Sequence, residues 1–72
     1  MNPYKELANA IIVQAVKDYR EAHRLLGMNP NDKSAKRDQR NIERFFRSEW
    51  FSILTDLNGE LLLKKLKEEV SL

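Results

Sequence analysis

Cysteine is absent from the 72-residue sequence, and histidine occurs once, as His23. Without cysteine there is no disulfide, and one histidine cannot supply the usual set of zinc ligands. A nucleophilic enzyme places a base and an orienting group beside its nucleophile, and only His23 could act as a histidine base. We interpret its helical neighbour Tyr19 as a packing contact rather than a catalytic partner. The sequence therefore predicts no catalytic residue, no metal site and no cofactor.

Glycine and long apolar runs are also scarce. The two glycines, Gly27 and Gly59, are both interpreted as helix punctuation, which leaves no glycine-rich loop for a phosphate. No window of 18 residues is apolar enough for a membrane-spanning helix, and the first residues lack the basic and apolar regions of a secretory signal. We therefore expect a cytoplasmic protein with no membrane partner.

Length and composition predict one helical domain over residues 1–72. A chain this short buries only about 60% of the surface that its unfolded form exposes, so its core is thin. Charged residues make up 33% of the chain and apolar residues 42%, which favours a folded helical protein over disorder. The formal net charge of +2 is too small to indicate nucleic-acid binding by itself. The distribution of the charges therefore matters more than their sum.

Apolar residues recur with helical spacing through most of the chain. The predicted helices cover about residues 3–26, 33–47, 48–57 and 60–70. The connection at 27–32 contains Asn29-Pro30, which disfavours helix, so the first two helices should form a hairpin. We predict an all-α fold, a small three- to four-helix bundle with an N-terminal helical hairpin.

Residues that begin and end helices separate these segments. Side chains that can cap a helix N-terminus precede each predicted helix: Asn2, Asp32, Ser48 and Asn58. Gly27 is expected to end the first helix in the left-handed conformation. At Ser48 either a kink or a full break fits the pattern.

The first predicted helix has a broad apolar arc. Its members are Tyr4, Leu7, Ala8, Ile11, Ile12, Ala15, Val16, Tyr19, Ala22 and Leu26. Such an arc is wide for a helix with a single neighbour. Either the helix lies between the other two helices, or a second copy of the chain covers part of it.

Large side chains are concentrated between residues 45 and 57. We expect this cluster to hold the core together, with a base-stacking platform as the alternative for its aromatic residues. Its members are Phe45, Phe46, Trp50, Phe51, Ile53, Leu54 and Leu57. Phe51 differs, because in an unbroken helix it would point to the basic side. Either the helix kinks, or Phe51 is exposed beside Arg44 as an anchor for a partner.

Five cations of the second predicted helix share one stripe, because they are spaced four, three, four and three residues apart. Arginine, which binds carboxylates and phosphates in a bidentate manner, supplies four of them. Three interpretations are open: a solvated face, a docking surface for a protein or anionic ligand, and contact with nucleic-acid phosphates. The predicted partner-binding residues are Lys33, Arg37, Arg40, Arg44, Arg47 and Phe51.

The segment from Glu43 to Glu60 reads ERFFRSEWFSILTDLNGE. It resembles a segment of small uncharacterised proteins encoded in phages and prophages of Gram-positive bacteria, and the preceding hairpin is similar as well. The resemblance implies a mobile-element origin and a cytoplasmic setting. It implies no activity and no site residues.

We therefore expect a non-enzymatic accessory protein of the phage or prophage type. It would act as a helical binding module for a host or phage protein, or for an anionic ligand, through the basic face of the second helix. One alternative is a nucleic-acid-binding protein that contacts phosphates with the same stripe. Another is a self-associating module, a homodimer formed through the arc of the first helix.

Overall fold

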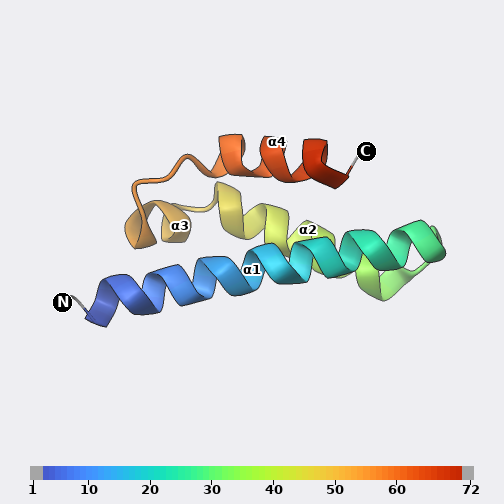
Figure 1. Ribbon diagram of the computed structural model, residues 1–72, viewed down its shortest axis with the longest axis horizontal. Coiled ribbons are helices and arrows are strands. Elements are labelled where there is room, and N and C mark those ends of the chain that lie inside the picture. Colours follow the sequence, from blue (N-terminus) through green and yellow to red (C-terminus); the bar gives the residue numbers. More distant parts are fainter. Residues whose placement is uncertain (1–2, 71–72) are drawn as a thin grey trace.

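The computed structural model describes residues 3–70 of the chain, which form four helices and no strand. The helices are α1 (Pro3–Met28), α2 (Lys33–Arg47), α3 (Glu49–Leu54) and α4 (Gly59–Val70). Figure 1 shows α2 running back along α1 and α3 lying beyond the end of α2, after which α4 turns back above α2 and runs in the same direction as α1. The prediction of a small all-α bundle with an N-terminal hairpin is confirmed. None of these helices combines the length and the apolar character needed to cross a bilayer.

The end of α1 differs from the prediction. Gly27 was expected to end the helix in the left-handed conformation, but α1 continues to Met28, and no glycine in the described part has a positive φ. The Asn29 N–H donates to the Leu25 carbonyl oxygen at 2.8 Å, so the helical hydrogen bonds pass through Gly27. Pro30 supplies the stop instead, because the residue before a proline avoids the helical conformation.

Three of the predicted caps are present, and the fourth, Asn2, lies outside the described residues. Asp32 Oδ1 accepts a hydrogen bond from the Ala35 N–H at 3.0 Å, and Asn58 Oδ1 accepts one from the Leu61 N–H at 3.2 Å. Each bond satisfies a backbone N–H that the first turn of a helix leaves unpaired. The predicted caps therefore fix the starts of α2 and α4.

Ser48 makes a full break between α2 and α3. Its backbone is extended, its Oγ accepts a hydrogen bond from the Phe51 N–H at 3.2 Å, and its hydroxyl donates to the Phe45 carbonyl oxygen at 2.6 Å. One side chain thus closes α2 and opens α3. α3 also ends earlier than predicted, because the backbone of Thr55 is already extended, so α3 is shorter than the predicted helix over 48–57.

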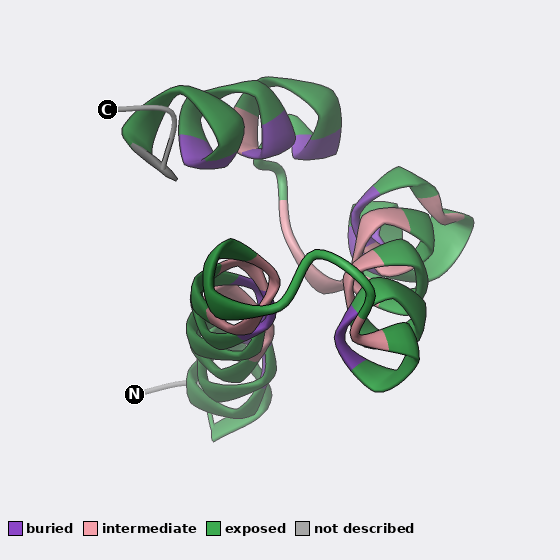
Figure 2. Cartoon of the chain, turned by 90° about the vertical axis from the view of Figure 1, so that its right-hand side faces the viewer, coloured by how far each residue is buried: buried purple, intermediate pink, exposed green. Residues whose placement is uncertain are grey.

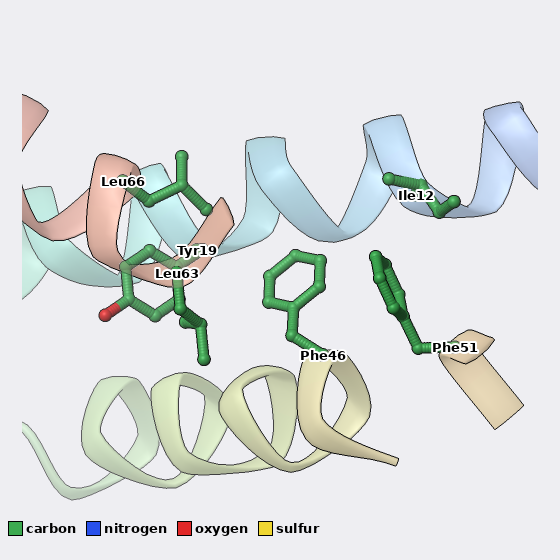
Figure 3. Packing of buried hydrophobic residues seen from close by; sticks show 6 residues of the cluster. All are labelled: Ile12, Tyr19, Phe46, Phe51, Leu63 and Leu66. Atoms are coloured by element: carbon green, nitrogen blue, oxygen red, sulfur yellow. The ribbon is translucent and has the colours of Figure 1, made fainter. Parts of the chain in front are cut away.

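α1, α2 and α4 enclose the core between them. Viewed along α1 and α2, with α4 lying across the view, the three helices stand at the corners of a triangle, and their buried residues turn toward its centre (Figure 2). The core cluster takes residues from all four helices: Ile12, Tyr19, Phe46, Phe51, Leu63 and Leu66 (Figure 3). The Phe46 and Phe51 rings meet edge to face with centroids 5.5 Å apart. The junction of α2 and α3 is therefore the aromatic part of this core.

Gly59 was interpreted from the sequence only as a turn residue between helices, but it also has a packing role. It is buried at the start of α4, and a methyl group there would overlap the Phe46 carbonyl oxygen and approach Phe51 Cδ1 to 3.2 Å. Only a residue without a side chain lets α4 begin this close to the end of α2.

The arc of α1 is only partly covered. Ala8, Ile12, Tyr19 and Ala22 are buried, whereas Tyr4, with 81% of its surface exposed, and other members near the N-terminus are not. The lengths explain the difference. The 26 residues of α1 extend about 39 Å, but the 15 of α2 extend only about 22 Å. The first turns of α1 therefore pass beyond α2 and face only the short α3.

Candidate functional site

The outward side of α2 carries four exposed cations, Lys33, Arg37, Arg40 and Arg44, which we call the basic face. They lie on the opposite side of α2 from its buried residues Ala35 and Phe46, as their positions on the helix require. α2 contains six of the 13 Lys and Arg residues of the chain and only two acidic residues, so positive charge is concentrated here. Figure 2 shows this outer side of α2 exposed.

The arginines of the chain divide into two groups by their surroundings. Arg20 pairs with Glu69 at 2.9 Å, and Arg24 pairs with Glu21 at 2.6 Å. Arg47, the last member of the predicted stripe, pairs with Glu60 at 2.7 Å and thereby ties α2 to α4. The three arginines of the basic face have no hydrogen-bonding or ion-pair partner between residues 3 and 70. Their guanidinium groups are available to an external anion.

Phe51 was predicted as a partner-binding anchor, and this prediction is wrong. Only 1% of its surface is exposed, and its ring packs edge to face on Phe45 and Phe46. The break at Ser48 is the physical reason. It ends α2 before Phe51 can follow the stripe of cations, and α3 turns the ring into the core.

The prediction that Trp50 belongs to the core is also wrong, because 57% of its surface is exposed. The six residues of α3 turn one face to the core, and Phe51 occupies it, so the adjacent Trp50 points elsewhere. Exposed tryptophan is frequent among the residues that dominate binding at protein interfaces. The sequence signal that could have identified Trp50 is the capping serine before two adjacent aromatic residues, since one short turn buries only one of them.

Further exposed apolar side chains lie near the N-terminus of α1. Tyr4, Ile53 and Leu57 line a shallow hollow of about 650 Å³ between α1, α3 and the segment after α3. The prediction that Ile53 and Leu57 belong to the core is wrong, because 76% and 58% of their surfaces are exposed. α3 ends at Leu54, and Phe51 already occupies the side of it that faces the core.

The only ionisable groups besides Tyr4 that line this hollow are Lys5 and Asp56, which carry opposite charges. The hollow thus has a mixed apolar and polar lining, to which Asn9 and Thr55 also contribute, and its two charges are opposite.

The polar groups on the inner sides of α1 and α2 hold the bundle together. The Tyr19 hydroxyl, fully buried with its ring, donates to Glu43 Oε1 at 3.3 Å, and Lys67 Nζ of α4 lies 3.3 Å from the same oxygen. Burial, and secondly the negative charge of Glu43, raise the pKa of Tyr19 above its ordinary value. His23 Nδ1 lies 3.5 Å from Gln39 Nε2. Tyr19 and His23 therefore both contact α2.

No protein-family model matches this sequence, and comparisons with curated proteins and with solved structures find no match.

Proposed function

We propose that this chain is a non-enzymatic helical binding module that docks an acidic protein surface, or another anionic ligand, on the basic face of α2. One observation carries the proposal. Each arginine outside the basic face pairs with a carboxylate, and the arginines of the face, Arg37, Arg40 and Arg44, have no such partner in the described part of the chain.

The chemistry of the face suits carboxylates. A guanidinium group offers a planar fork of N–H donors that matches a carboxylate or a phosphate, and such charge-assisted hydrogen bonds are about twice as strong as neutral ones. From Lys33 to Arg44 the cations extend about 16 Å along a straight helix. A row of this length fits acidic side chains on about three turns of a partner helix, or along one edge of a protein surface.

Two further parts of the proposal rest on the sequence. The resemblance to small phage and prophage proteins supports an accessory protein of a mobile element that acts in the cytoplasm. Such a protein would act by stoichiometric binding to a host or phage protein.

Nucleic acid is the alternative that the same four cations support, since phosphates also attract arginine. It differs from the protein partner in a measurable way. Binding to phosphates releases counterions, so the affinity would fall steeply with salt and the retained material would be sensitive to nuclease.

Affinity retention from bacterial lysate, with and without nuclease, tests the proposal. The baits are the wild type, Arg40→Glu/Arg44→Glu, and the control Lys17→Glu/Lys65→Glu. Both variants change the net charge from +2 to −2, but the control residues are exposed ones on α1 and α4. We expect a nuclease-resistant protein to be retained by the wild type and the control and lost from the Arg40→Glu/Arg44→Glu variant. Retention of nucleic acid alone would favour the alternative, and equal retention by all three baits would refute a role for the basic face.

A further inference from the structure

A groove lies between α1 and α2 on the side of the hairpin away from α4. α4 covers one side of the α1 and α2 pair (Figure 2), where its Glu69 and Lys67 bond Arg20 of α1 and Glu43 of α2. On the other side are two adjoining hollows of about 380 and 390 Å³. Asp18, Asn41 and Ile42 line both hollows, so the two are parts of one groove.

The floor of the groove is apolar at one end and through its middle. Ile11 and Ala15 of α1 and Ile42 and Phe45 of α2 line it, and Ile11 still has 37% of its surface exposed. The groove follows α1 from Ile11 to Leu25, a distance of about 21 Å. This length equals about four turns of a helix, and the space between two packed helices is where a third helix places an apolar ridge.

The charges in the groove are all negative. Its ionisable lining residues are Asp18, Glu21 and Asp38, and no lysine or arginine lines it. Asp18 accepts a hydrogen bond only from the neutral Gln14, at 2.9 Å, and Asp38 has no partner within residues 3–70. Glu21 already forms an ion pair with Arg24, and the hydrogen bond from that guanidinium holds the pKa of the Glu21 carboxyl below its usual value. The groove thus combines an apolar floor with the carboxylates of Asp18 and Asp38, each of which could pair with a cation of a bound partner.

We propose that this groove docks an amphipathic helix of a partner protein, with lysine or arginine on both sides of its apolar ridge. The apolar ridge would cover Ile11, Ala15, Ile42 and Phe45, and the flanking cations would meet Asp18 and Asp38 on opposite walls. A second copy of this chain is disfavoured as the occupant, because two grooves placed face to face would bring like charges together. An acidic helix is disfavoured for the same reason.

This surface is separate from the basic face and has the opposite charge. Asp38 lies on the groove side of α2, whereas Arg40 and Arg44 lie on its outward side. Replacing the arginines should therefore leave a basic helix bound, and replacing the aspartates should leave an acidic partner bound. The two proposals can fail independently.

Binding of two synthetic 18-residue helical peptides tests the inference. Both peptides carry the same leucine ridge, flanked by lysine in one and by glutamate in the other, and fluorescence anisotropy gives each Kd at constant ionic strength. The proteins are the wild type, Asp18→Lys/Asp38→Lys, and the control Glu6→Lys/Glu68→Lys. The control changes the charge equally at exposed positions outside the groove. Circular dichroism confirms that each variant is folded.

We expect the wild type to bind the lysine peptide at least tenfold more tightly than the glutamate peptide. The Asp18→Lys/Asp38→Lys variant should lose at least tenfold in affinity for the lysine peptide, and the control less than threefold. Equal losses in the two variants, or no binding to the wild type, would overturn the inference. So would a dimer of the wild type in sedimentation equilibrium that the Asp18→Lys/Asp38→Lys variant changes, since a second copy would then occupy the groove.

Discussion

Trp50 and Phe51 are adjacent in the chain and lie in opposite environments, one on the surface and one in the aromatic core. Phe51→Ala should lower the free energy of unfolding by about 3–5 kcal/mol, because it removes a buried ring that the surrounding helices cannot replace. Trp50→Ala should cost about 1 kcal/mol or less, since much of the indole is in water. Urea denaturation followed by circular dichroism measures both without relying on the tryptophan signal.

Phe51→Leu keeps this comparison measurable if the alanine variant does not fold, because leucine retains most of the buried volume. A loss of stability at Trp50 as large as that at Phe51 would contradict the assignment of Phe51 to the core and Trp50 to the surface.

Tyr19 makes the free energy of unfolding of the protein depend on pH in the alkaline range. Its pKa is raised above about 10 by burial and by Glu43, so the folded protein holds the phenolic proton to a higher pH than the unfolded chain does. This contribution is complete below about pH 10 and is lost as the pH rises through the raised pKa. The free energy of unfolding should therefore fall more steeply above about pH 10 in the wild type than in Tyr19→Phe.

Tyr4→Phe is the control for this measurement, because Tyr4 is exposed at the N-terminus of α1. It should keep the pH dependence of the wild type. Parallel curves for the wild type and Tyr19→Phe would show that the buried hydroxyl does not carry the effect.

The orientation of a side chain was predictable from the sequence where it depends only on the position of the residue within one unbroken helix. The cations of the basic face lie on the outside of α2 because their spacing fixes their direction within an unbroken helix. Phe51 and Trp50 were not predictable in this way, because their directions depend on where α2 ends and on how α3 packs. Both depend on tertiary packing, which the spacing of residues along a helix does not predict.

At the scale of the elements, the approach of α4 to α2 depends on Gly59. Gly59→Ala should lower the free energy of unfolding by about 1–3 kcal/mol or more, because its methyl group would overlap the Phe46 carbonyl oxygen and displace α4. Gly27→Ala is a matched control at a helical position with open space around it. It should stabilise the protein by about 0.5–1 kcal/mol, since alanine favours the helix.

Thermal or urea unfolding of these two variants separates the two roles of glycine. If Gly59→Ala were as stable as the wild type, the close contact of α4 with the end of α2 would be wrong.

The starts of α2, α3 and α4 were predictable because their signals are local. Asp32, Ser48 and Asn58 each accept a hydrogen bond from the backbone N–H three residues later. Such a cap depends on nearby residues only, so the sequence is enough to predict it. The partial covering of α1 was not predictable, because it follows from the unequal lengths of helices that pack on one another. The stop supplied by Pro30 rather than Gly27 shows that two competing local signals also need the structure to decide between them.

For the whole molecule, α2 separates two surfaces of opposite charge. Its outward side carries the basic face, and one of its edges contributes Asp38 to the groove against α1. A net charge of +2 conceals this arrangement, since the excess of positive charge on α2 is offset by carboxylates elsewhere. The stripe could be predicted from the sequence, but the pairing of Arg20, Arg24 and Arg47 could not, and it is this pairing that sets the basic face apart.

The central claim is that position on α2, and not net charge, makes the basic face a binding surface. The Kd of a fluorescent glutamate-rich peptide, measured at one ionic strength, tests it for the wild type and for two variants of equal charge. We predict that Arg40→Glu/Arg44→Glu weakens binding more than tenfold, equivalent to about 1.4 kcal/mol, and that Lys17→Glu/Lys65→Glu weakens it less than threefold. Equal weakening in the two variants would contradict the claim, because affinity would then follow the overall charge of the molecule.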